Sequence, residues 1–274
     1  MWRRKDHNTK PVISGGIKRR RLRDWYRQGL GQRLLREERR ALDDALPNLF
    51  GYHLLQVGSP VDEALCTSSL IPNRVLLESG LALESLHTSV PVAMRPLMYA
   101  EAHALPILTD SVDVVLLAHT LEFEQDPHQV LREADRVLVP EGHVVILGFN
   151  PWSIWGMWRL LLSRWAAPPW NGQFRSIRRI KDWLALLGFD ARVCRGFFFR
   201  PPLRHDGVMQ RLKILEKLGQ RCWPFAGAVY IVVAKKRVMT PTPIRPRWRP
   251  GRSLVGAGLV KTSTQRVTNE RKQG

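Results

Sequence analysis

The length, composition and charge of this chain narrow the kind of protein it can be. Its 274 residues are 44% apolar, which is enough for the core of one large domain or two small ones. Three widely spaced cysteines without a CxxC pair argue against a disulfide framework or a zinc site, and they fit a reducing compartment. No apolar run follows the charged first residues, so we expect no secretory signal and a cytoplasmic location.

The net charge of +19 is unevenly distributed along the chain. Residues 1–23 carry a net charge of +8 and residues 235–274 a net charge of +10, which leaves +1 for residues 24–234. Within that middle part, residues 151–215 hold 12 basic and 3 acidic residues. This distribution is typical of a protein with a surface for anions, but it fits solubilising tails equally well.

The composition of the two ends predicts the domain boundaries. Residues 1–21 mix Lys, Arg, Gly and Pro, and residues 236–274 are rich in Pro and Arg. Segments of this kind bury too little apolar surface to fold. We therefore expect two disordered basic tails around one folded domain at residues 22–235.

In chain order, the domain begins with one or two helices across Leu22–Leu46, which Pro47 ends. Four short apolar runs then predict strands at His53–Val57, Arg74–Leu77, Val112–Ala118 and Val144–Phe149. Helical patterns lie between them at Val61–Leu70, Gly80–Thr88 and Pro127–Leu138. Further along we expect a helix at Ser176–Leu187, strands at Ala191–Phe199 and Ala228–Ala234, and a helix within Val208–Leu218. Near-continuous Val and Leu runs are typical of parallel strands covered on both faces, so the pattern predicts a doubly wound α/β sheet.

The most informative stretch is Glu101–Phe149. It contains an ordered series of short motifs: Glu101-Ala102, Leu105-Pro106, Asp113–Ala118, His119–Phe123, Arg136-Val137-Leu138 and Pro140-Glu141-Gly142. In this order they resemble the second half of the type 11 group of class I S-adenosylmethionine (SAM)-dependent methyltransferases. The resemblance extends more weakly across residues 22–235.

That resemblance implies a Rossmann-like fold, a cofactor and candidate site residues. The fold would be a seven-stranded, mainly parallel sheet whose last strand, Ala228–Ala234, runs antiparallel. The cofactor would be SAM. Glu101 takes the position of the family's adenine-binding Asp, and the backbone N–H of Ala102 follows it. His119 would face the thioether of the cofactor and is the one weak catalytic candidate, although a structural histidine at a strand end is an equal alternative.

Glu78 is the candidate for binding the ribose. A carboxylate at the end of a strand matches the two hydroxyl donors of a diol. Glu78 closes the apolar run at residues 75–77 and lies 20 residues beyond Gly58, which is the spacing of ribose-binding acids in nucleotide-binding α/β folds. A surface glutamate after a strand is the alternative.

The loop after the first strand departs from the family pattern, which expects an acid followed by Gly-x-Gly-x-Gly. Here Gln56 replaces the acid, Gly58 is retained, and Pro60 and Asp62 stand where later glycines would be. Glycines at such positions allow close approach of the backbone to a ligand, whereas proline fixes its φ angle and lacks an N–H. The loop therefore fits either a divergent enzyme or a relative that only binds.

Three functions remain open at this point. The first is methyl transfer from SAM to a small-molecule or lipid-like acceptor, for which positioning of the methyl group is the main catalytic requirement. The second is a catalytically degenerate methyltransferase fold that binds RNA or a protein partner through its basic tails. The third is methylation of structured RNA, with the tails binding phosphates. No nucleophile or metal site is evident, and the oligomeric state is not predicted.

The stretch Trp152–Trp165 is unusually rich in tryptophan. At 100° per residue, Trp155, Trp158 and Trp165 fall on one apolar stripe of a helix, with Arg159 and Arg164 beside it. Interfacial helices have this composition. We therefore hypothesise a peripheral contact with the inner membrane surface or an entrance for an apolar acceptor. A helix that simply covers the sheet is the alternative.

Overall fold

The computed structural model describes residues 13–61, 65–78, 97–162, 169–201 and 226–238. Its helices are α1 (Ile13–Tyr26), α2 (Gly29–Ala45), a short 3₁₀ helix η1 (Leu46–Asn48), α4 (Pro127–Val137), α5 (Ile154–Leu162) and α6 (Ile177–Leu186). Its strands are β1 (His53–Val57), β2 (Asn73–Glu78), β3 (Leu97–Tyr99), β4 (Val112–Ala118), β5 (Leu138–Phe149), β6 (Phe189–Phe197) and β7 (Val229–Lys236).

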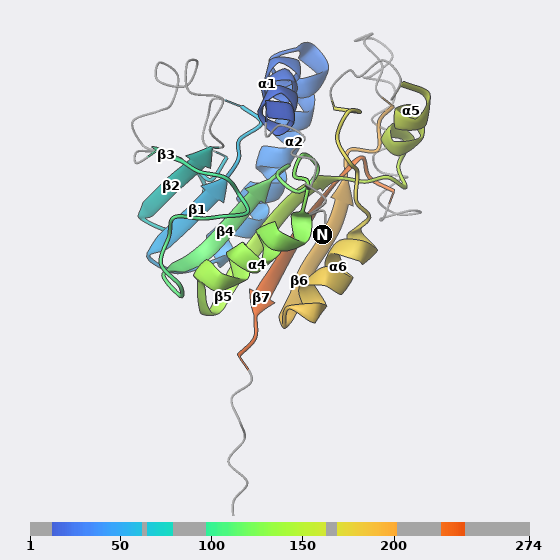
Figure 1. Cartoon of the computed structure of the whole chain (residues 1–274). Coiled ribbons are helices and arrows are strands. Elements are labelled where there is room, and N and C mark those ends of the chain that lie inside the picture. Colours follow the sequence, from blue (N-terminus) through green and yellow to red (C-terminus); the bar gives the residue numbers. More distant parts are fainter. Residues whose placement is uncertain (1–12, 62–64, 79–96, 163–168, 202–225, 239–274) are drawn as a thin grey trace, which may run out of the picture. The chain divides into compact units, whose positions relative to one another are not determined.

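The strands form one seven-stranded sheet in the order β3-β2-β1-β4-β5-β7-β6. The pairs among β3, β2, β1, β4 and β5 are parallel, and β7 runs antiparallel between β5 and β6 (Figure 1). This confirms the predicted α/β class, the mainly parallel sheet and the antiparallel last strand. The strand β3 had no apolar run that predicted it.

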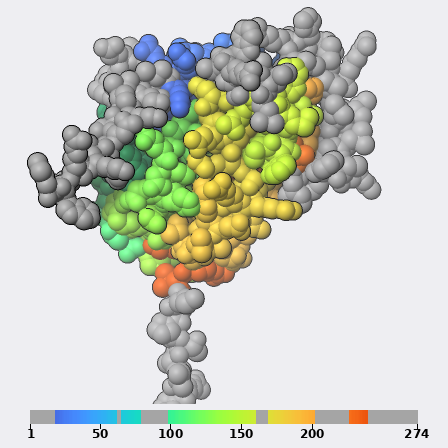
Figure 2. Space-filling view, turned by 45° about the vertical axis from the view of Figure 1, so that its right-hand side comes forward, coloured from blue at the N-terminus to red at the C-terminus, as the bar shows by residue number. Residues whose placement is uncertain are grey.

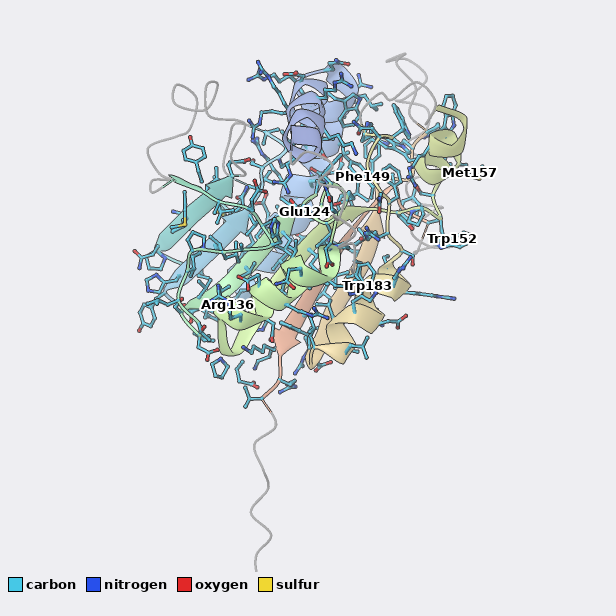
Figure 3. The ribbon with its side chains drawn as sticks, viewed as in Figure 1. Glu124, Arg136, Phe149, Trp152, Met157 and Trp183 are labelled. Carbon is cyan, nitrogen blue, oxygen red and sulfur yellow. The ribbon has the colours of Figure 1, made fainter. Side chains whose placement is uncertain are left out.

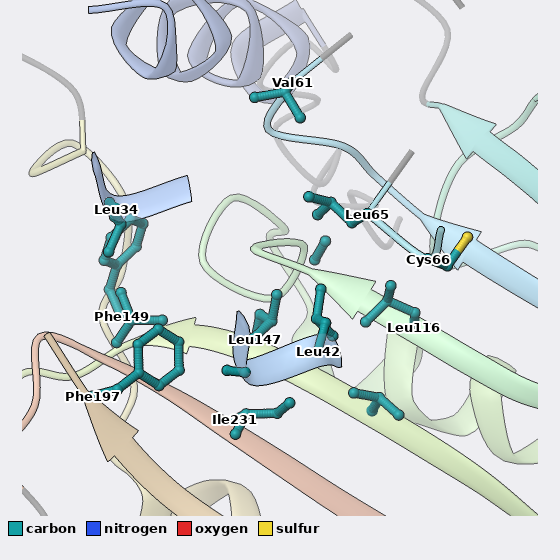
Figure 4. Close-up of a cluster of buried hydrophobic side chains, with 14 of the residues drawn as sticks. Leu34, Leu42, Val61, Leu65, Cys66, Leu116, Leu147, Phe149, Phe197 and Ile231 are labelled. Atoms are coloured by element: carbon teal, nitrogen blue, oxygen red, sulfur yellow. The ribbon is translucent and has the colours of Figure 1, made fainter. Parts of the chain in front are cut away.

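Helices cover both faces of the sheet, and alternating strand residues supply two cores. On one face, Leu54, Leu116 and Leu147 pack against Leu34 and Leu42 of α2 (Figure 4). On the other face, the neighbouring strand residues pack against α4 and α6; they include Leu55, Val115, Leu117, Val144 and Ile146. Burial on both faces explains why these strands lack polar alternation.

Local signals place the helix ends where the sequence predicted them. Asp126 caps α4 by accepting hydrogen bonds from the N–H groups of His128 and Gln129 at 3.0 and 3.1 Å. Ser176 caps α6 through the N–H of Arg179. Gly188 follows α6 with φ +84°, a conformation that favours glycine.

Asp113 and Arg136, which belong to the family motifs, form hydrogen bonds to the backbone of loops. Asp113 at the start of β4 accepts hydrogen bonds from the N–H groups of Tyr52 and His53 at 2.8 and 2.9 Å. Arg136 on α4 donates to the carbonyl oxygens of Leu105 and Ile107, each at 2.9 Å. These bonds fix the segments that enter β1 and β4, so the motifs define the scaffold of the domain.

Two predicted elements differ in the structure. The helix expected at Val61–Leu70 is wrong for residues 65–70, which form a bend, a turn and irregular backbone. The N–H of Leu65 donates to Oε1 of Gln56 at 3.3 Å and so bonds to a side chain instead of a helical carbonyl. The strand β5 starts at Leu138 and includes the expected Pro140–Gly142 turn as an irregularity, with Glu141 at φ +65° and a register shift opposite β4. The helices expected at 80–88 and within 208–218 lie outside the described residues.

The expected N-terminal boundary also changes, because α1 begins at Ile13. The prediction of disorder is therefore wrong for residues 13–21, which continue into an apolar helix end where Leu22, Trp25 and Tyr26 are buried. Residues 1–12 and 239–274 lie outside the described part of the chain. The strand β7 ends at Lys236, next to the predicted end of the domain.

The tryptophan-rich helix exists as α5, and at Trp155 it packs inward, which fits the alternative of a helix that covers the sheet. Trp155 is 0% exposed, and its ring packs against those of Trp25, Phe149 and Phe198. A Cβ on Gly156 would lie 1.9 Å from the carbonyl oxygen of Pro151, so the preceding turn presses on this side of the helix. The helix therefore faces inward at Trp155 and Gly156. In the described part of the chain, no helix has both the length and the apolar character of a membrane span.

Candidate functional site at the carboxyl ends of the strands

The candidate site lies where the parallel strands β1, β2 and β4 end. Parallel strands place their carboxyl ends at one edge, and ligands of open α/β sheets bind there. Helix α1 lies beyond the arrowheads of these strands (Figure 1). It approaches this edge closely, since Arg23 contacts Ser59 and Glu78, and Arg19 forms an ion pair with Glu124. The site is therefore covered by the N-terminal helix.

Gln56 and Gly58 stabilise the loop after β1. Gln56 departs from the family pattern, whereas Gly58 retains it. The Nε2 of Gln56 donates to the carbonyl oxygen of Gly58 at 3.1 Å, while its Oε1 accepts from Leu65. Gly58 has φ +75°, and a Cβ there would lie 3.0 Å from Oγ1 of Thr120. The structure thus gives Gln56 a loop-holding role and explains why glycine is needed at position 58.

Glu78 ends β2 and lies at the site as the sequence predicted. Its side chain is 2% exposed, and its Oε1 lies 3.3 Å from Nη2 of Arg23. This oxygen accepts no hydrogen bond from the described residues. Burial raises the pKa of the Glu78 carboxyl group, and the guanidinium groups of Arg23 and Arg19 oppose that shift. A buried carboxylate with an unsatisfied oxygen is suited to bind hydroxyl donors.

Glu101 and Ala102 follow β3 on the adenine side expected from the resemblance. Ala102 is buried in the core on the α4 face, and Glu101 is half-buried. The carbonyl oxygen of Glu101 accepts the N–H of Ala104 at 3.0 Å, which makes a tight turn. The strand pair β2–β3 brings Tyr99 opposite Glu78, so the two predicted cofactor contacts share one end of the sheet.

His119 is the first residue after β4, and it lies within a buried polar cluster. Its Nε2 is 3.0 Å from Oε1 of Glu38, and its Nδ1 is 3.2 Å from Oε1 of Glu122. The hydroxyl of Tyr26 donates to Oε1 of Glu38 at 2.7 Å and lies 3.1 Å from Nε2 of His119. We call these four residues, Tyr26, Glu38, His119 and Glu122, the His119 cluster. It joins α1, α2 and the end of β4.

The electrostatics of the His119 cluster favour a protonated imidazole. Burial alone would lower the pKa of His119, but the carboxylates of Glu38 and Glu122 raise it to about 10. Both ring nitrogens then donate, one to each carboxylate. Burial, together with Glu38, raises the pKa of Tyr26, so its hydroxyl stays protonated and donates. One imidazolium between two carboxylates leaves the cluster with a net negative charge. The cluster lies next to the carboxyl ends of the parallel strands, which we call the cofactor edge.

The sequence interpretation found His119 but missed its partners. Glu38 carried a usable signal, because on α2 it shares one helix face with Leu34 and Leu42, and a glutamate in the middle of an apolar face needs a buried partner. Glu122 lies three residues beyond His119 inside the recognised motif. Tyr26 and Arg23 gave no local signal, since their roles depend on how α1 packs over the sheet.

The sheet order, the antiparallel β7 and the carboxylate at the end of β2 define a class I methyltransferase fold with its cofactor edge. Residues 82–146 match the family model of the methyltransferase domain, type 11. The chain is 33% identical over 203 residues to the uncharacterized protein YafS of Escherichia coli K12, covering 74% of this chain and 76% of YafS. The chain therefore belongs to the same family as YafS, within the type 11 group of class I SAM-dependent methyltransferases.

Solved structures share the fold at low sequence identity. One is a SAM-dependent methyltransferase from Thermotoga maritima described as a possible histamine N-methyltransferase, with a TM-score of 0.58, 18% identity, and coverage of 81% of this chain and 99% of that one. Another is a methyltransferase-like chain of Haloferax volcanii in complex with the activator Trm112, with a TM-score of 0.55, 14% identity, and coverage of 79% and 98%. At these identities the likeness concerns the fold.

The cofactor of this enzyme is SAM, and the residues at the strand ends fit it. The buried carboxylate of Glu78, which is ion-paired with Arg23, is an acceptor of the kind that a ribose hydroxyl requires. Gly58 leaves room beside Thr120 where a side chain would clash. When bound, SAM supplies an electrophilic methyl group. Glu78 would hold the ribose, Gly58 would let the loop approach the ligand, and the His119 cluster would line the edge beside them.

Proposed function

We propose that the protein transfers the methyl group of SAM to a small-molecule or lipid-like acceptor. The main support for the proposal is that helix α1 covers the site. From α1, Arg23 reaches Glu78 and Tyr26 reaches His119, both at buried positions. An acceptor that reacts at such a site must be small or must extend a narrow flexible part into it. A folded RNA would meet that requirement only by extruding a nucleotide into the site, which costs unstacking energy.

The residues at the site would act mainly by binding and orientation. Glu78 would fix the ribose, and the net negative charge of the His119 cluster would favour positive charge at the same edge. The aromatic ring of Phe149 lies 4.3 Å from that of His119 and helps to exclude water. In an environment of low polarity, these electrostatic contacts are stronger than in water.

Two experiments test the proposal in sequence. Titration calorimetry with SAM and with its demethylated product first measures cofactor binding. Purified protein with radiolabelled SAM is then incubated with separated cell fractions of small molecules, lipids and RNA. We expect label in the small-molecule or lipid fraction. Label confined to RNA would overturn the proposal, and RNA binding without SAM binding would favour the degenerate, binding-only alternative.

A further inference from the structure

The outer side of α5 and the turn before it expose large apolar side chains. Trp152 is 79% exposed and Met157 is 66% exposed, with Ile154 between them in sequence. Figure 3 shows Trp152 and Met157 pointing away from the sheet at the margin of the molecule. Trp155 anchors the opposite side of the same helix and donates from Nε1 to the carbonyl oxygen of Arg200 at 2.8 Å. The apolar side chains are thus presented by a helix fixed from behind.

Basic side chains lie on helix α6. Arg178, Arg179 and Lys181 are exposed there, while the buried side of α6 packs on the sheet through Ile180 and Leu184. Figure 2 shows α5, in yellow-green, and α6, in yellow, on the same face of the molecule. We call Trp152, Ile154, Met157, Arg178, Arg179 and Lys181 the docking face.

We propose that the docking face binds an anionic lipid bilayer. Its apolar side chains would enter the headgroup region, and its cations would contact lipid phosphates. Tryptophan and methionine beside arginine and lysine is the combination that interfacial helices use. The charge also matches, since the chain carries +19 overall and α6 has one acid, Asp182, among its exposed charges. Anionic headgroups attract each such cation when it lies near the surface.

The docking face is connected to the cofactor edge through packed aromatic rings. The Trp155 ring lies 5.8 Å from that of Trp25 on α1, and the Trp25 ring lies 5.1 Å from that of Tyr26 in the His119 cluster. A docked bilayer would therefore lie near the helix that covers the site. The inference that the acceptor is lipid-like rests on the proposed function. The inference that the docking face binds bilayers does not depend on it.

The test is vesicle binding by the full chain. Vesicles of phosphatidylethanolamine with phosphatidylglycerol are compared with vesicles of phosphatidylcholine alone, in sedimentation assays at matched salt. Wild-type protein should bind the anionic vesicles with a blue shift of tryptophan emission. Trp152→Ala with Met157→Ala should weaken binding by about tenfold or more, because two exposed side chains no longer enter the bilayer. Arg178→Glu with Lys181→Glu should weaken it by about fivefold or more for each charge.

Two control variants keep this test specific. Phe50→Ala removes another strongly exposed aromatic ring, which precedes β1 and so lies at the amino ends of the parallel strands, and should leave binding unchanged. Arg40→Glu changes an exposed charge on α2 and should have a much smaller effect than the α6 pair. Equal losses in the test and control variants would overturn the proposal, as would absence of wild-type binding. A dimer in sedimentation that Trp152→Ala abolishes would also overturn it, in favour of a second copy on this face.

This test separates the two proposals. If the vesicles bind but no labelled product forms, the proposed function fails while the docking face stands. If labelled product forms but the vesicles do not bind, the docking face fails and the methyl transfer stands.

Discussion

The guanidinium group of Arg23 lies 3.3 Å from the carboxylate of Glu78, and both side chains are nearly fully buried. The pair joins α1 to the end of β2, across 55 residues of sequence. It is the point at which the N-terminal helix contacts the carboxylate that is the candidate for binding the cofactor ribose. We therefore expect stability and cofactor binding to depend on the same charged group.

Removal of either partner should destabilise the protein strongly. We expect Arg23→Gln to lower the free energy of unfolding by about 3 kcal/mol or more, because a buried charge loses its partner. The double variant Arg23→Gln with Glu78→Gln should lose much less than the sum of the two single losses. Chemical denaturation of the four proteins gives the coupling energy. Arg40→Gln, which removes an exposed pair with Glu37, is the control and should change stability by less than about 1 kcal/mol.

Glu78→Gln should weaken binding of SAM and of its demethylated product. A neutral amide cannot replace the charge-assisted hydrogen bonds to a diol, so we expect a loss on the order of 2–4 kcal/mol, roughly 30- to 1000-fold in affinity. Calorimetry is performed at a temperature where circular dichroism shows that the variant is folded. An unchanged dissociation constant, with measurable binding by wild type, contradicts the assignment of Glu78 to the ribose.

The His119 cluster should make stability depend on pH in the alkaline range. The pKa of His119 is about 10 in the folded protein, against 6.5 for an ordinary histidine. Its contribution is therefore fully present below about pH 6.5 and is lost as the pH rises through about 10, with a size on the order of a few kcal/mol. Melting temperatures of wild type and His119→Gln across this range provide the measurement. A wild-type decline as shallow as that of the variant would show that the imidazole is not held in its charged form.

Gly58→Ala should impair both the fold and the cofactor edge. The φ angle of +75° is costly for alanine, and its Cβ would crowd Oγ1 of Thr120, so we expect a loss of about 1–2 kcal/mol in stability. Gly29→Ala is a matched control, because a Cβ there meets nothing within 4 Å and the position is helical. It should be neutral or slightly stabilising. Thermal denaturation distinguishes the two, and equal effects would argue against strain at position 58.

Removal of residues 1–12 and 239–274 should leave the melting temperature nearly unchanged. These segments carry net charges of +3 and +7, and they lie outside α1 and β7. Without them, salt-dependent retention on heparin should fall sharply, because it depends on the number of cations. A large loss of stability would instead show that one of the segments packs against the domain.

Local patterns in the sequence determined the elements of this protein. Apolar runs located β1, β4 and β7, because strands buried on both faces consist of little else. Side-chain caps located α6, since Ser176 and Gly188 act within one turn of the helix ends. The ordered motifs between Glu101 and Phe149 identified the family. Each of these signals acts between residues close together in the chain.

Only the tertiary structure decided which polar groups meet at the site. His119 and Glu38 are 81 residues apart in sequence, and they become neighbours because α2 packs on the sheet beside the end of β4. The packing of α5 likewise placed Trp155 inside, whereas the helical stripe alone left open whether it meets a membrane or covers the sheet. A hydrophobic periodicity in the sequence specifies that one face of a helix or strand is buried. Which layer covers that face, and which charges this layer carries, depends on how distant segments pack together.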